Sequence, residues 1–173
     1  SCLLLLMSLA CSNTDQEIRD MAPVKPLPVE ESENVVVYFS ENAQLKVKLK
    51  APVLIRTVDE KIENEMPEGI HLIFYDSLGA ISSEITANYA IDKNSEFIME
   101  ARDKVVVTNE KGEKLETEHL IWNRKKEMIH TEEFVKITTG DEIIMGDGLE
   151  SNQDFSKYHI KNPRGESILL EDE

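Results

Sequence analysis

The order of apolar and polar residues along the chain shows a strand–turn–strand unit that returns after thirty residues. Residues 85–91 and 98–107 form the first copy, and residues 115–121 and 128–137 repeat its pattern. A weaker third copy runs from Ile144 to Ile160. Self-similarity at such a spacing is typical of repeat architectures, in which each unit buries its apolar face against its neighbours. The pattern therefore predicts stacked strand pairs that form an elongated sandwich or groove.

The segment before the repeats also has the pattern of strands. Residues 43–51 alternate between apolar and polar side chains, which predicts a half-buried strand that residues 53–58 continue. Residues 35–39 and 70–75 are further strands, and the acidic segment 60–67 is expected to be a loop. Turn signals recur between the strands, and no segment shows a convincing helical period. The predicted fold class is all-β, a twisted β-jellyroll or β-sandwich built from repeated strand pairs.

Within each repeat the apolar phase slips by three residues instead of two, between Ala87 and Ala90 and again between Thr117 and Leu120. Such a slip is typical of a β-bulge, which bends the strand and increases its twist. Because several inward residues are small, we expect either a slender core or space for a chain-like guest, with Trp122 as a core aromatic or as a lining residue of that space. The large residues predicted to face inward include Val105, Val107, Leu120, Trp122, Ile129, Val135 and Ile137.

Length and charge limit the possible functions. The 173 residues are enough for one domain with a core and tails, and the formal net charge is −15 from 34 acidic and 19 basic residues. The densest positive run, residues 124–126, lies at a predicted turn, and the sequence has no basic stripe. Because nucleic-acid binding depends on neutralising phosphates, we expect no nucleic-acid partner.

The start of the chain is predicted to be an export segment and a tether. Residues 1–11 form an apolar run too short for a spanning helix, and we expect them to be a signal-peptide remnant that ends in a lipobox at Cys11. The alternatives are a buried thiol or a disulfide with Cys2, which is less attractive because processing would remove Cys2. Residues 12–34 are acidic and contain half of the prolines, which predicts an extended stalk before a folded domain at residues 35–173.

Enzyme motifs are absent from the sequence: it contains no GxSxG, P-loop, HExxH, CxxC or GxGxxG pattern. The repeat alignment places His119 and His130 on the outward face, and the aspartates within residues 141–154 fit turns and match no EF-hand spacing. Gly146 and Gly148 indicate a bulge or a close approach of two backbones. We therefore expect no catalytic residue, no cofactor and no metal.

Four segments together resemble a known family: "ITANYA" at residues 85–90, "VVVTNEKGEKLETEHLIWN" at 105–123, "MIHTEEFVKI" at 128–137 and "IMGDGL" at 144–149. Residues 43–160 resemble LptC, the periplasmic component of bacterial lipopolysaccharide export, in the lipoprotein form found in Bacteroidetes-type bacteria. The resemblance implies a jellyroll of the OstA/LptA type that holds acyl chains in its interior.

The resemblance also implies a function and partners. The protein would accept lipopolysaccharide from the inner-membrane ABC transporter formed by LptB, LptF and LptG, and pass it to LptA. It would reside in the periplasm, held at the inner membrane by a lipid on Cys11 in place of the spanning helix of the best-known members. The inward residues given above, Trp122 among them, would line the acyl groove, and Tyr158 and Ile160 would contact LptA.

Two other classes of protein stay open at this point. One is a scaffold or interaction lipoprotein whose sandwich has a dry core and binds no lipid. A weaker one is a hydrolase on a β-sandwich, for which the sequence offers no nucleophile–base pair. The character of the interior distinguishes the transport protein from the scaffold: an apolar slot favours transport, and a close-packed core favours scaffolding.

Overall fold

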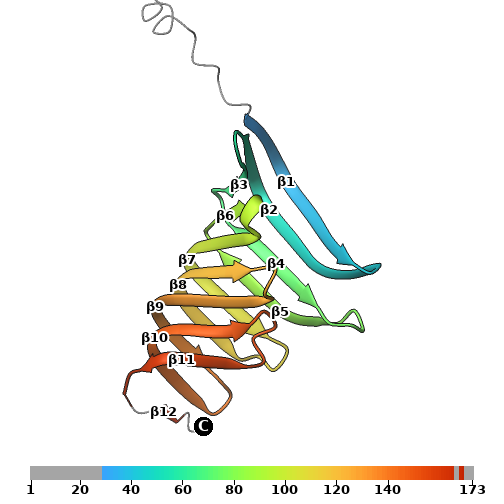
Figure 1. Ribbon diagram of the computed structural model, residues 1–173. Coiled ribbons are helices and arrows are strands. Elements are labelled where there is room, and N and C mark those ends of the chain that lie inside the picture. Colours follow the sequence, from blue (N-terminus) through green and yellow to red (C-terminus); the bar gives the residue numbers. More distant parts are fainter. Residues whose placement is uncertain (1–28, 166–167, 170–173) are drawn as a thin grey trace, which may run out of the picture.

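The computed structural model describes residues 29–165 and 168–169, which form one antiparallel sheet and a single 3-10 turn, η1 (Asn94–Glu96). Figure 1 shows the strands as a stack with β1 at one end and β11 and β12 at the other. The all-β fold class predicted from the sequence is confirmed. The strands are β1 (Val29–Glu41), β2 (Gln44–Val58), β3 (Ile62–Met66), β4 (Ile70–Tyr75), β5 (Ile81–Ala87), β6 (Tyr89–Lys93), β7 (Ile98–Asn109), β8 (Lys114–Asn123), β9 (Met128–Thr138), β10 (Glu142–Asn152), β11 (Tyr158–Pro163) and β12 (Ile168–Leu169).

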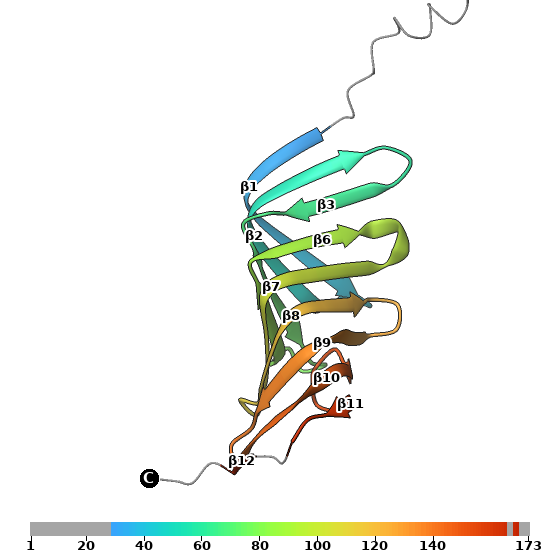
Figure 2. The same ribbon diagram turned by 90° about the vertical axis from the view of Figure 1, so that its left-hand side faces the viewer.

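The sheet is folded over on itself, so that the long strands take part in two layers. The first half of β2 pairs with β4 and its second half pairs with β3. Likewise, β7 pairs with β6 through its first half and with β5 through its second half. We call the layer that contains β4 and β5 the first layer, and the layer that contains β3 and β6 the second layer. The layers meet along one side, the corner, and their turns lie on the opposite, open side (Figure 2).

Backbone irregularities at the corner produce the fold. The register of β7 against β8 shifts between Arg102 and Val105, and the two residues between them have positive φ angles of 62° and 55°. The register of β8 against β9 shifts between Thr117 and Ile121. Bulges of this kind bend a strand and raise its twist. The phase slip between Thr117 and Leu120 that the sequence indicated is therefore confirmed as a corner bulge.

Gly69 shows how closely the backbones approach at the corner. A β-carbon at this position would lie 2.5 Å from the carbonyl oxygen of Ala87, and the φ angle of Gly69 is +96°. Only glycine combines this conformation with that contact. The residue allows the chain to cross from β3 in the second layer to β4 in the first.

The apolar core lies between the two layers. The inward residues named from the sequence are all buried, each with at most 5% of its surface exposed: Val105, Val107, Leu120, Trp122, Ile129, Val135 and Ile137. Thr117 is a buried polar residue at the corner, and its Oγ1 donates a hydrogen bond to the carbonyl of Phe134 at 2.8 Å. The outward residue Met128, next to Ile129, is 36% exposed.

Two boundaries differ from the sequence prediction. The segment 60–67, expected to be a loop, contains β3, so that expectation is wrong. Its residues are mostly polar, but β3 pairs with β2 on one side and with β6 on the other, and only Met66 at its end is fully buried. In addition, β1 begins at Val29, so residues 29–34 of the expected stalk are strand.

A charge cluster on the outer face of the second layer joins β6, β7 and β8. Glu100 is paired with Lys93 Nζ at 2.5 Å and with Arg102 Nη2 at 2.6 Å, while His119 Nε2 lies 3.7 Å away. The hydrogen bonds from Lys93 and Arg102 outweigh the partial burial of the carboxylate and lower the pKa of Glu100 from 4.5 to about 2. The cluster thus favours the ionised form of Glu100.

This pairing predicts a loss of stability in acid. A carboxylate whose pKa is lower in the folded state stabilises that state above its unfolded pKa, and the contribution disappears as the pH falls toward 2. Since Lys93 and Arg102 are partly exposed, we expect a contribution of about 2 kcal/mol. Urea unfolding at pH 6 and pH 2.5 should show that Glu100→Gln removes this part of the pH dependence. Glu116→Gln, which changes a more exposed carboxylate, serves as the control; an equal effect of both variants would contradict the assignment.

Candidate functional site: an apolar groove between the layers

The interior is hollow in the half of the molecule that contains β1 and β2. A cavity of about 710 Å³ opens there on the open side, between the β1–β2 turn, η1 and the β8–β9 turn. Phe39 from β1, Val47 from β2 and Trp122 from β8 are apolar lining residues. Its volume lies within the range of about 300–1,000 Å³ that is usual for ligand pockets.

A smaller cavity of about 190 Å³ lies beside the first one. Leu49 and Met66 are among its apolar lining residues, and Phe39 and Asn94 line both cavities. The shared residues show that the two spaces are neighbours. Together they form an apolar groove that enters between the layers from the open side, and we call them the groove.

Trp122 forms one wall of the groove and connects the two layers. Its ring meets the ring of Phe74 from β4 edge-on, with centroids 5.0 Å apart and an interplanar angle of 85°. Its indole Nε1 donates a hydrogen bond to Gln153 Oε1 at 3.1 Å. An edge-to-face pair of this kind stabilises a packed arrangement by about 1 kcal/mol beyond its buried area. Trp122 is therefore both a core aromatic and a lining residue, which the sequence left as alternatives.

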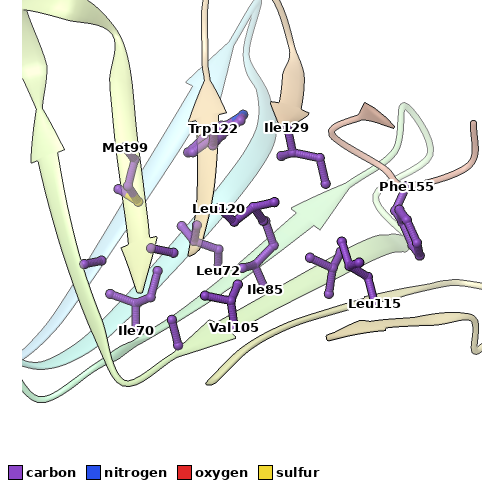
Figure 3. Close-up of a cluster of buried hydrophobic side chains, with 14 of the residues drawn as sticks. Ile70, Leu72, Ile85, Met99, Val105, Leu115, Leu120, Trp122, Ile129 and Phe155 are labelled. Carbon is purple, nitrogen blue, oxygen red and sulfur yellow. The ribbon is translucent and has the colours of Figure 1, made fainter. Parts of the chain in front are cut away.

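The half of the interior beyond Trp122 is filled. Leu115, Ile129 and Ile137 have no exposed surface, and Phe155 from the β10–β11 loop is buried beside them in the same cluster. Figure 3 shows Phe155 at one end of the row of inward side chains, past Ile129 and Leu115. The interior is thus an open groove in one half and a packed core in the other.

The mouth of the groove carries positive charge although the whole chain is acidic. Lys46, Lys125 and Lys126 lie on its lining together with Glu41 and Glu127. Deeper in the groove, Arg124 Nη1 lies 2.7 Å from Asp92 Oδ1, and both side chains are at most 14% exposed. The basic run of residues 124–126, which the sequence located at a turn, is therefore at the entrance of an apolar space.

Sequence reasoning missed several residues of this site. Phe39 and Phe74 were predicted only as parts of strands, Gln153 fell in a predicted turn, and Phe155 was not assigned to any element. A phenylalanine alone in a polar loop was the signal for Phe155, because a large apolar side chain between turn residues usually finds a buried position. Asp92 also belongs to this site: it lies in β6 and is buried.

Tyr158 and Ile160, the residues expected to contact a partner, lie on the end strand β11. Both are half-buried and packed against the core. The ring of Tyr158 stacks on that of Phe155 with centroids 4.9 Å apart. Their side chains face inward, so a partner at this end would meet mainly the backbone edge of β11.

The expected attachment site Cys11 and residues 1–11 lie outside the described residues. Over the range that the structure describes, no helix has the length and apolar character needed to cross a membrane. In the same range, no three side chains of the metal-binding types come together. The expectations of a lipid anchor and of an absent metal therefore stay predictions.

Comparison with known families gives one match. A family model described as "Lipopolysaccharide-assembly, LptC-related" matches residues 2–163, which is most of the chain. The match includes both repeats, the corner bulges and the groove. A search of curated proteins finds no match.

Proposed function

Since the chain belongs to the LptC family, whose members act in lipopolysaccharide transport, we propose that its groove receives lipopolysaccharide acyl chains as part of the transport bridge. The protein would accept the lipid from the inner-membrane transporter formed by LptB, LptF and LptG and pass it to LptA. This is a binding role without catalysis. The observation that supports it most directly is the apolar groove, whose larger cavity has a volume of about 710 Å³ and has lysines at its mouth.

The energetics of the groove favour acyl chains over other ligands. Burying one chain of about a dozen CH₂ groups contributes on the order of 10 kcal/mol. Lipopolysaccharide phosphates would be repelled by the net charge of −15, but that repulsion is screened beyond about 10 Å. The lysines at the mouth lower it further at the place where the polar head of a bound lipid would lie. The acyl chains therefore supply the affinity.

Strand addition at the ends of the sheet would extend the groove into the partner proteins. The outer edge of β1 and the outer edge of β11 have no partner strand among the described residues. Such edges present unpaired backbone groups that another chain can pair with. In this proposal β1 faces the transporter and β11, with Tyr158 and Ile160 behind it, faces LptA.

Anchoring through a lipid on Cys11 would hold β1 near the inner membrane. More than one acyl chain on the cysteine gives stable membrane binding. We expect Cys11→Ser to release the protein from membranes or to block its processing, measured by fractionation and gel mobility. Unchanged membrane binding at unchanged mobility would contradict the anchor.

Photocrosslinking in cells tests the groove itself. Neighbouring aromatic residues on β1 offer a matched pair: Phe39 lines the groove, whereas Tyr38 is 58% exposed on the other face. A benzophenone amino acid at residue 39 should give lipopolysaccharide adducts, and the same probe at residue 38 should give at least about tenfold fewer, because strand neighbours face opposite sides. An absence of adducts at residue 39 would favour the scaffold alternative with no lipid ligand.

A further inference from the structure

The loop between β10 and β11, residues 153–157, bridges the two layers across the open side. It leaves the second layer after Asn152, and Ser83 Oγ of the first layer donates a hydrogen bond to the carbonyl of Gln153 at 2.9 Å. Asn109 Nδ2, at the first-layer end of β7, donates to the carbonyl of Phe155 at 3.0 Å. We call residues 153–157 the bridging loop. Its contacts close the open side just beyond the groove.

Only one side chain of the bridging loop is fully buried. Phe155 has 0% exposure, while Ser156 and Lys157 are exposed and Gln153 and Asp154 are half-buried. The loop makes no strand ladder with the first layer; side-chain donors hold it there instead. Segments with few buried apolar contacts are those that open locally without global unfolding. The bridging loop is therefore attached to the first layer by side-chain hydrogen bonds, with one buried ring, and not by a strand ladder.

The backbone of Phe155 is strained in this position. Its φ angle is +53°, in the left-handed region that bulky residues rarely adopt. Such a conformation persists only where the surroundings impose it, and it costs free energy that opening would return. The strain lowers the difference in free energy between the closed and the open loop.

The position of Phe155 interrupts the path that a lipid would take. The groove ends at Trp122 and Gln153, which are hydrogen-bonded to each other. Beyond them, Phe155 occupies the space between the layers next to Leu115 (Figure 3). An acyl chain that moves from the groove toward β11 must take the place of this ring.

We propose that the bridging loop is a displaceable plug, and that the filled half of the interior becomes an acyl-chain site only after Phe155 has swung out. The proposal rests on the proposed function, because it concerns the passage of the same lipid. It also assigns a role to Gln153: its contact with Trp122 connects the end of the groove to the plug.

Hydrogen exchange on the full-length protein tests the plug directly. The amide of Gln153 donates to the carbonyl of Glu127, and the amide of Phe155 donates to the carbonyl of Asn152. Purified lipopolysaccharide should speed exchange of both amides at least about tenfold, while the β8–β9 ladder stays protected. The fluorescence emission of Trp122, the single tryptophan, should change at the lipid concentrations that speed the exchange of these amides. Bound lipid with unchanged exchange at both amides would overturn the plug.

A variant pair tests whether Phe155 competes with lipid. With a photoreactive probe at residue 129, in the filled half, Phe155→Ala should raise the lipopolysaccharide adduct about tenfold because a larger fraction of molecules is open. Phe134→Ala, at an outward residue that is 44% exposed, is the matched control and should leave the adduct unchanged. If Phe155→Ala does not fold, Ser83→Ala removes one hydrogen bond to the loop and should raise the adduct about two- to tenfold.

The outcomes separate the two proposals. Adducts at residue 39 with no gain at residue 129 in either plug variant would reject the plug and leave the proposed function standing. A decrease at residue 129 in Phe155→Ala would also reject the plug, because Phe155 would then be a binding residue. An absence of adducts at both positions would reject the proposed function and the plug together.

Discussion

Replacing Val107 by aspartate should prevent the domain from folding. Val107 has no exposed surface and faces the filled half of the interior. A carboxylate buried there without a partner costs several kcal/mol, even if it is protonated in part. Single domains are stable by about 5–15 kcal/mol, so the change removes most or all of the stability. Circular dichroism during heating should show no cooperative transition for this variant.

The neighbouring residue supplies the control. Thr108 has nearly the same shape as valine, lies on the same strand and is half-exposed on the outer face. Thr108→Asp should change the free energy of unfolding by about 1 kcal/mol or less, as is usual for surface positions. If Thr108→Asp destabilised the protein as strongly as Val107→Asp, the assignment of inner and outer faces in β7 would be wrong.

Replacing Gly146 by alanine should detach β11 from the sheet. The added β-carbon would lie 2.4 Å from Ile160 Cγ2 and 2.7 Å from the carbonyl oxygen of Asn162. The second contact is with backbone, so β11 has to move away, at a cost of about 3 kcal/mol. Because the proposed function uses β11 as the edge for LptA, a pull-down should lose LptA and retain the transporter.

Gly140→Ala is the matched control for Gly146→Ala. No atom lies within 4 Å of a β-carbon at residue 140, and the glycine is in the β9–β10 turn. This variant should bind both partners as the unaltered protein does. Loss of both partners in Gly146→Ala, with loss of the folded state by circular dichroism, would show that the clash unfolds the whole domain.

The repeat pattern contained most of the fold. The alternation of apolar and polar residues in 128–137 predicted the inward face correctly, because every second side chain of a strand with one buried face is apolar. The phase slip between Thr117 and Leu120 predicted the position of the corner. Gly146 lies at a close approach of two strands, and Gly148, with a φ angle of +73°, lies at a bulge, as the two glycines had indicated. These features are local in sequence, so one sequence is enough to find them.

The features that the sequence did not reveal depend on contacts between distant segments. The strand β3 is polar and becomes a strand because β2 and β6 pair with it on both sides. The division of the interior into groove and packed core depends on where Phe155 lies, and its contacts are with Ser83 and Asn109 in distant strands. Neither the secondary-structure propensity of a residue nor the period of the apolar pattern indicates a contact between distant segments.

The bridging loop also affects how the stack of strands loses its structure. In an array where each strand meets only its neighbours, the end strands melt first and unfolding is graded along the stack. Here the carbonyl of Gln153 accepts a hydrogen bond from Ser83, which lies seventy residues earlier in the chain. This hydrogen bond connects the β11 end of the array to its middle. When the bridging loop is closed, β10 and β11 therefore unfold cooperatively with β5. In the open state this link is gone, and the last strands fray independently of the rest.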